Sequence, residues 1–186
     1  MKERISEAAV TEILQRGLRF SMRDLANRLG MSTKTLYVYF PSKEALISSL
    51  VDTSIQEMKA AEHKIMTDPD LSLTQKLRLA LVNMPQGVAF GQVHLLQELK
   101  KQFPHQWEAV DEHLNQGWDY IRHLVQQGIA TKELREFDVE LFIQVYVGAM
   151  YQFMDYSLPA NQRFTLEQAL TETVDLLMSG ILGPAS

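Results

Sequence analysis

Residues 21–46 constrain the fold of this chain more than any other stretch, because they combine two short helix signals with a glycine between them. Ser21 and Asp24 have the spacing of a capping box, in which the serine oxygen accepts a backbone N–H and the carboxylate bonds back to the serine. Gly30 falls where a helix ends in a left-handed residue, and Ser32 is suited to cap a second helix. That second helix spans only about seven residues and is not stable alone. The stretch therefore predicts two short helices, joined by a tight turn and supported by the rest of the chain.

The second short helix has a polar outward face. Leu36 and Phe40 are its only strongly apolar inward positions, and Pro41 ends it. In a helix-turn-helix, the exposed side of the second helix enters the major groove of DNA. An ordinary helical hairpin with a solvated surface has the same pattern, so these positions alone leave both interpretations open.

The run from residue 30 to residue 46, GMSTKTLYVYFPSKEAL, resembles the signature of the TetR family of bacterial transcriptional repressors. The shared pattern is a glycine, an apolar residue and a serine, followed by leucine–tyrosine, tyrosine–phenylalanine and lysine–glutamate–x–leucine. The matching positions further upstream are Ile5, Ala8, Ala9, Gly17, Leu25 and Ala26. Beyond about residue 50 the chain is similar to the family only in length and helical character.

This resemblance implies a ligand-responsive repressor that binds a pseudo-palindromic, double-stranded operator DNA as a homodimer. It also implies an unidentified small-molecule effector, which binds in the body of the protein and releases the repressor from its operator. A helical ligand-binding or adaptor protein without operator binding is the alternative function.

Hydrophobic periodicity predicts an all-α chain of about nine helices without strands. We expect a DNA-binding helix-turn-helix domain at residues 1–48, with a three-helix headpiece, and a helical ligand-binding and dimerisation domain at residues 49–186. Gly17 is expected to end the first helix, and Gly128 a long helix that starts at Phe103–Pro104. The expected helices span about 3–17, 21–29, 32–40, 42–66, 72–84, 91–102, 103–128, 138–156 and 165–181.

The charge is distributed unevenly along the chain. Residues 1–50 hold eight Lys/Arg and five Asp/Glu, whereas residues 51–186 hold ten Lys/Arg and eighteen Asp/Glu. The net charge of −5 therefore conceals a positive N-terminal part, which is the part expected to meet DNA phosphates. The acidic remainder should be repelled by DNA.

The candidate DNA contacts divide into base-reading and phosphate-binding residues. Thr33 and Lys34, on the exposed first turn of the second short helix, are the expected base readers, since lysine donates to guanine O6 and N7. Tyr37, Tyr39 and Lys43 are expected to contact phosphates. The complete candidate set is Ser21, Arg23, Ser32, Thr33, Lys34, Thr35, Tyr37, Tyr39 and Lys43. A packed aromatic side chain is the alternative for Tyr39, and a solvated surface lysine for Lys43.

Two further sets of residues belong to the body. The helix expected at 138–156 is apolar almost all round, which indicates burial on every side, either in a core or partly against a second subunit. The expected dimer interface comprises Phe142, Val145, Gly148, Ala149, Gln152, Leu170, Val174, Leu177 and Ile181. The candidate effector-binding residues, each of which could instead be core packing, are His63, Met84, Phe90, His94, Trp107 and Trp118.

The sequence contains no pattern of an enzyme. No two of its five histidines have the spacing of a metal-binding helix pair, and it lacks a phosphate-binding glycine loop and a nucleophile elbow. We therefore expect no catalytic residue, no metal and no cofactor. The absence of cysteine fits the reducing cytoplasm, and we expect neither a secretory signal nor a membrane span.

Overall fold

A computed structural model describes residues 1–83, 93–155 and 166–182. Within these ranges the chain forms ten α-helices, one 3-10 helix and no strand, apart from an isolated bridge between Leu134 and Leu182. The helices are α1 (Lys2–Arg16), η1 (Gly17–Arg19), α2 (Met22–Leu29), α3 (Thr33–Tyr39), α4 (Lys43–Thr67), α5 (Leu73–Leu81), α6 (Val93–Gln102), α7 (Pro104–Asn115), α8 (Asp119–Ala130), α9 (Val139–Asp155) and α10 (Leu166–Ile181). The predicted all-α class is confirmed. No helix in the described ranges is long and apolar enough to cross a membrane.

The chain divides into two compact units. The first comprises Met1–Gln56 and Pro85–Asp111, and the second comprises Glu57–Met84 and Glu112–Ser186. The headpiece helices α1, α2 and α3 belong to the first unit, together with α6. A boundary between two functional domains at residue 48 stays a prediction.

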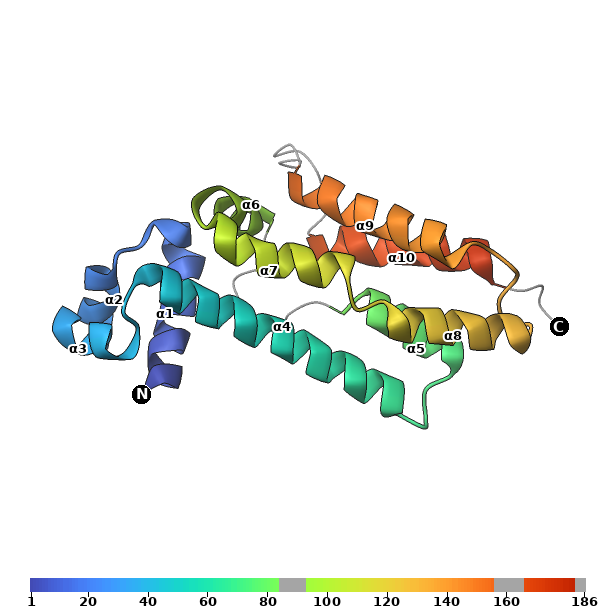
Figure 1. The fold of residues 1–186 in the computed structure, drawn as a ribbon, viewed down its shortest axis with the longest axis horizontal. Coiled ribbons are helices and arrows are strands. Elements are labelled where there is room, and N and C mark those ends of the chain that lie inside the picture. The colour runs from blue at the N-terminus through green and yellow to red at the C-terminus, as the bar shows by residue number, and fades with distance from the viewer. Residues whose placement is uncertain (84–92, 156–165, 183–186) are drawn as a thin grey trace. The chain divides into compact units, whose positions relative to one another are not determined.

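In the first unit, α1 packs against α2 and α2 against α3, while α6 contacts η1 (Figure 1). The apolar positions at helical spacing point inward: Ile5, Ile13, Leu25 and Leu36 have no solvent exposure. Two N-caps set the starts of the short helices, as expected. The Ser21–Asp24 capping box opens α2, and the Ser32 hydroxyl accepts the backbone N–H of Thr35 at the start of α3.

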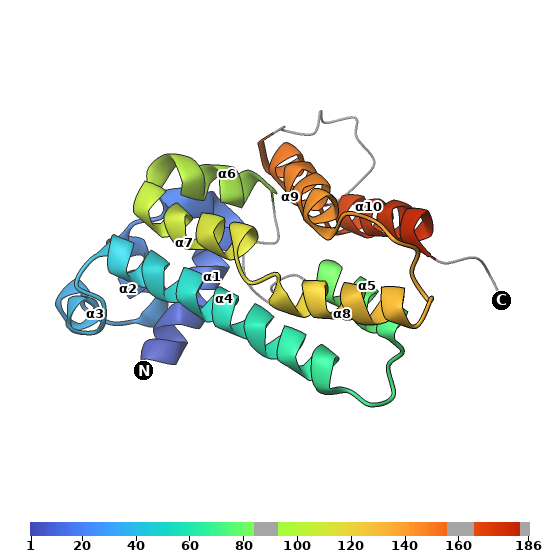
Figure 2. The same cartoon turned by 45° about the vertical axis from the view of Figure 1, so that its right-hand side comes forward.

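In the second unit, α5 lies against α8 and α10, and α9 against α10 (Figure 2). The Ser72–Gln75 capping box opens α5, as expected. Inside the unit, the buried Tyr146 hydroxyl donates to the carbonyl oxygen of Leu81 at 2.6 Å. This bond links α9 to the end of α5.

The expected long helix from residue 103 to residue 128 is wrong in two respects. It consists of two helices, since α7 ends at Asn115 and α8 begins at Asp119, with Gly117 between them at φ +85°. Gly128 does not end a helix but lies inside α8, which continues to Ala130. A Cβ atom at Gly128 would lie 2.6 Å from the Leu134 side chain, so close packing explains this glycine.

Helix α9 is not buried on every side. Phe142, Tyr146 and Met150 face the core, whereas Leu141 and Val145 are 58% and 49% exposed. The described part of the protomer thus leaves one apolar strip of α9 in solvent.

Candidate nucleic-acid interface

Helix α3 is held in place by its inner side and by its two ends. Leu36 is completely buried and Phe40 is 4% exposed. Gly30 adopts the left-handed conformation at φ +65° and ψ 31°, which turns the chain sharply between α2 and α3. These contacts leave the opposite side of α3 on the surface.

Most of the candidate contact residues on α3 are exposed. Thr33, Lys34 and Tyr37 are exposed, while Tyr39 is half-buried. Ser32 and Thr35 are also exposed, but their hydroxyl oxygens lie 2.8 Å apart and share a hydrogen bond. The DNA contacts expected of Ser32, Thr35 and the other candidate residues of α3 stay predictions.

The start of α2 is polar and well organised. The Ser21 hydroxyl donates to the Asp24 carboxylate at 2.6 Å, and the Asp24 backbone N–H donates to the Ser21 hydroxyl at 3.1 Å. The hydrogen bonds from the Ser21 side chain and backbone hold the pKa of Asp24 below its ordinary value. Arg23 is exposed beside this cap.

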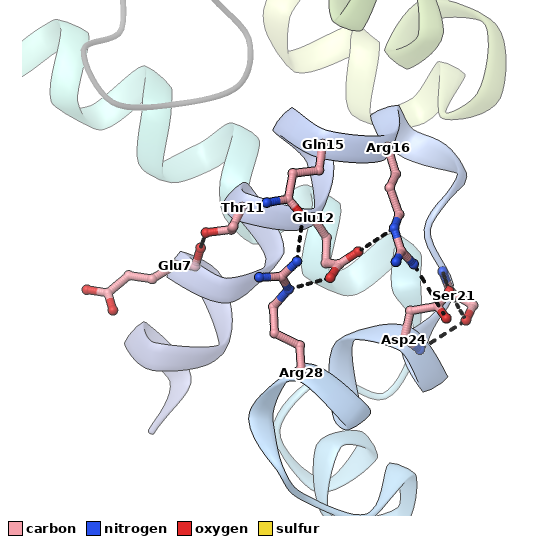
Figure 3. A network of polar contacts seen from close by, with 8 residues as sticks. All are labelled: Glu7, Thr11, Glu12, Gln15, Arg16, Ser21, Asp24 and Arg28. Carbon is pink, nitrogen blue, oxygen red and sulfur yellow. Dashed lines mark hydrogen bonds and ion pairs between the residues drawn. The ribbon is translucent and has the colours of Figure 1, made fainter.

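A buried carboxylate braces α2 against α1 (Figure 3). Glu12 is 2% exposed, and one of its oxygens accepts a hydrogen bond from Arg28 Nε. Its other oxygen lies 3.5 Å from Arg16 Nε, and Arg28 also donates to Gln15 Oε1 at 2.6 Å. This network links α2 to α1, and because Glu12 is buried, the loss of its partner Arg28 should be costly.

We expected Lys43 to point outward from the start of α4. In the structure its side chain turns inward instead. Its ammonium group donates to the carbonyl oxygen of Leu18 and lies 4.5 Å and 5.5 Å from the ring centroids of Phe20 and Phe103. Burial lowers the pKa of Lys43. Cation–π contacts of this kind favour the inward position. A phosphate contact by Lys43 stays a prediction, and it would require the side chain to leave these partners.

The residue that binds Lys43 through its carbonyl oxygen, Leu18, is also held by α6. The Leu18 backbone N–H donates to the Glu98 carboxylate at 2.6 Å. Gly17 lies directly beside this carboxylate, at φ +68° and ψ −165°. The turn between α1 and α2 is thus tied on one side to α4, through Lys43, and on the other to α6, through Glu98. Sequence reasoning missed Glu98, because its partner lies 80 residues away.

Four residues of the expected dimer interface are instead part of the protomer core. They are Phe142, Leu170, Val174 and Ile181, none of which is more than 5% exposed. These side chains fill the interior of the second unit in the protomer. Of the other candidates, Val145, Gly148 and Gln152 are exposed, and Ala149 and Leu177 are half-buried. Leu176, which was not in the set, is 74% exposed on α10.

The candidate effector residues have different environments. His63 and His94 are exposed, and Met84 and Phe90 lie outside the described residues. Trp107, in the first unit, is buried, with the Lys100 ammonium 5.6 Å from its ring centroid.

In the second unit, Trp118 packs edge-to-face on Tyr146 with centroids 5.3 Å apart, and its indole N–H donates to the carbonyl oxygen of Leu114. Two half-buried ionisable groups of this unit were missed: burial lowers the pKa of His113 and raises that of Glu62. No group of three His, Asp or Glu side chains in the described ranges could hold a metal ion.

The sequence model for bacterial regulatory proteins of the tetR family matches residues 5–50. The chain is 34% identical over 181 residues to an uncharacterised HTH-type transcriptional regulator, YvaF, of Bacillus subtilis strain 168. This match covers 97% of the chain and 95% of YvaF. The chain is also 26% identical over 184 residues to the fatty acid metabolism regulator protein of the same organism, covering 95% and 93% of the two sequences.

The fold is similar to that of AibR, whose structure was solved in complex with isovaleryl coenzyme A and operator DNA. The TM-score is 0.63 at 17% sequence identity, and the match covers 95% of this chain and 97% of AibR. At this identity the likeness shows the fold alone.

Proposed function

The chain belongs to the TetR family of bacterial regulatory proteins, and we propose that it is a repressor that binds a pseudo-palindromic operator as a homodimer and is released by a small molecule. Membership of the family makes it a helix-turn-helix, DNA-binding transcriptional regulator. The observation that supports the finer proposal is the exposed side of α3, which carries Thr33, Lys34 and Tyr37 opposite the buried Leu36. The Ser32 cap sets the start of this helix. Its place of action is the cytoplasm, where the chromosome lies.

The proposed contacts follow from the position of each side chain on the headpiece. Thr33 and Lys34 read base edges in the major groove, while Tyr37 and Tyr39 contact phosphates and fix the register. Arg23 adds a phosphate contact from the exposed start of α2. The excess of basic residues in this part of the chain supports the proposal, because phosphate neutralisation supplies much of the affinity for DNA.

Lys43 has two roles in this proposal. Without DNA it is bound to the Leu18 carbonyl oxygen and to two aromatic rings. On DNA its ammonium group reaches a phosphate instead. Lys43→Ala is expected to weaken binding to all sequences alike, in contrast to Lys34→Ala, which should alter sequence preference.

The proposed dimer interface uses the exposed surfaces of α9 and α10. Val145 and Leu176 supply exposed apolar side chains, and a Cβ atom at Gly148 would meet nothing within 4 Å, so a partner helix has room to approach closely. A two-fold axis through this surface would pair two headpieces. Two such headpieces read half-sites about 34–36 Å apart, or one turn of DNA.

An acyl-coenzyme A thioester is the first effector class to test, on the strength of two similarities. One similar protein is a fatty acid metabolism regulator, and AibR was crystallised with isovaleryl coenzyme A. Within the second unit, the desolvated His113 and Glu62 are polar groups that an enclosed ligand could meet. The effector acts by binding one conformation better than the other, so that the spacing of the headpieces no longer fits both half-sites.

Selection of binding sites from random duplexes by the full chain tests the proposal. We expect a pseudo-palindromic sequence to be enriched, two chains to bind each duplex in sedimentation experiments, and an acyl-coenzyme A of suitable length to release them. Enrichment of no sequence would favour the alternative of a helical ligand-binding or adaptor protein. An effector that bound equally well to the free and the DNA-bound dimer would contradict the proposed mechanism of release.

A further inference from the structure

Val38 is an exposed apolar side chain on the recognition helix. It is 77% exposed, compared with 47% for Tyr37 on the same helix and 50% for Leu14 on α1. Valine is also a poorer helix former than alanine, because its branched side chain loses rotamer freedom against the preceding turn. In the described part of the free protomer this side chain therefore contributes little to stability.

The position of Val38 on α3 points it away from the protein. Successive residues of a helix are separated by about 100°, so Val38 lies about 160° from the completely buried Leu36. Lys34 precedes Val38 by four residues and shares its face of the helix. Val38 is thus on the outermost line of α3, beside the lysine proposed to read a base.

The chemistry of the major groove limits what a valine can recognise there. Its isopropyl group neither donates nor accepts a hydrogen bond, so the donor and acceptor atoms of base edges give it no favourable contact. Among the four bases only thymine presents a methyl group in the major groove, and apolar side chains are its usual partners. Lys34 and the basic headpiece supply the charge complementarity that would bring this face to DNA.

We propose that Val38 is a specificity-determining residue that contacts the 5-methyl group of a thymine in each operator half-site. This inference rests on the proposed operator binding and adds a base identity to it. The base pair read by Val38 neighbours the one read by Lys34, because the two side chains are one helical turn apart on the same face.

The test removes the methyl group from the DNA rather than from the protein. Using the tightest-binding duplex selected by the full chain, each thymine of a half-site is replaced in turn by deoxyuridine, which differs only by the 5-methyl group. Burial of one methyl group corresponds to about a four-fold change in Kd for one half-site, and about fifteen-fold when both half-sites are changed. We expect this loss at one thymine position per half-site for the unaltered protein.

The same duplexes are then measured with Val38→Ala, and with Leu14→Ala as a control for another exposed apolar residue of the first unit. Val38→Ala should fold normally, since alanine is the better helix former. The difference in affinity between the thymine and deoxyuridine duplexes at that position should be much smaller for Val38→Ala, because the shorter alanine loses most of the contact, whereas Leu14→Ala should retain the full difference.

Three results would overturn the inference, and they can be told apart. If the unaltered protein is insensitive to deoxyuridine at every position, no thymine methyl is read. If Val38→Ala keeps the same sensitivity, another residue reads it. If no duplex is selected at all, operator binding itself fails, and the inference fails with it.

Discussion

Replacing Gly17 by alanine should destabilise the first unit by about 3 kcal/mol. Gly17 has φ +68° and ψ −165°, a region of backbone conformation that is open almost only to glycine and costs other residues about 1–3 kcal/mol. The added Cβ would also lie 2.6 Å from one oxygen of the Glu98 carboxylate and 3.0 Å from the other. Glu98 must therefore move, which breaks its hydrogen bond with the Leu18 backbone N–H.

A hydrogen bond to a charged group contributes about 1.5–3 kcal/mol, and part of this is recovered because Glu98 is only half-buried and can turn toward water. Together with the backbone strain, a total of about 3 kcal/mol corresponds to a decrease in Tm of about 6–12 °C for a chain of this size. Thermal unfolding followed by circular dichroism would measure this decrease in Tm.

Gly30→Ala is the matched control for the backbone effect. Gly30 also has a positive φ, of +65°, but an added Cβ would meet nothing within 4 Å. We expect a loss of only about 1 kcal/mol, or about 3 °C, from the left-handed conformation. In a Glu98→Ala background, Gly17→Ala should cost less than in the unaltered protein, because the clash is gone and only the strain is left. Equal effects of the two glycine substitutions, or an undiminished effect in the Glu98→Ala background, would refute this reasoning.

Three further predictions concern the caps, the exposed surface of α10 and the core of the second unit. Ser21→Ala should lower Tm at pH 7, and the loss should shrink as the pH falls below the ordinary carboxyl pKa toward the lowered pKa of Asp24 in the folded protein. The bonds from Ser21 that depress this pKa are lost when Asp24 protonates, and thermal unfolding over a series of acidic pH values checks this. Leu176→Glu should yield a folded monomer in sedimentation equilibrium, whereas Val174→Glu should unfold the chain, because Val174 is completely buried. Tyr146→Phe should cost about 0.5–1.5 kcal/mol in denaturant unfolding through loss of its hydroxyl hydrogen bond.

Local signals in the sequence predicted the short elements well. The capping boxes at Ser21 and Ser72, and the glycine turn at Gly30, depend on residues within four positions of one another, and all three occur in the structure. The family signature between residues 30 and 46 rests on the same kind of short-range pattern. These signals identify where helices begin and end without any knowledge of the tertiary fold.

Features that depend on distant partners were not predictable in this way. Lys43 looks like a surface lysine, because Leu18 and Phe103, which hold it inside, lie 25 and 60 positions away. In the sequence, Gly128 predicts the end of a helix. In the structure a glycine is needed there because the side chain of Leu134, in the segment after α8, packs directly against it.

The same limit applies to the expected dimer interface. Leu170, Val174 and Ile181 form an apolar stripe on α10, and such a stripe shows that one face is buried. It does not distinguish burial in the protomer from burial against a partner. Leu176 and Val145 are exposed in the protomer, and only the packing of α5, α9 and α10 separates them from the buried stripe. Their place in a dimer interface stays a prediction.

The most direct test of the account is to repeat the selection of binding sites from random duplexes with Lys34→Ala. If the exposed face of α3 reads the operator, the variant should select a half-site that has lost its preference at one base pair. It should also bind the original duplex more weakly by about 1–3 kcal/mol per affected base pair, while its affinity for scrambled DNA stays the same. An unchanged selected sequence, or equal losses on cognate and scrambled duplexes, would contradict the central claim that this face of α3 recognises DNA.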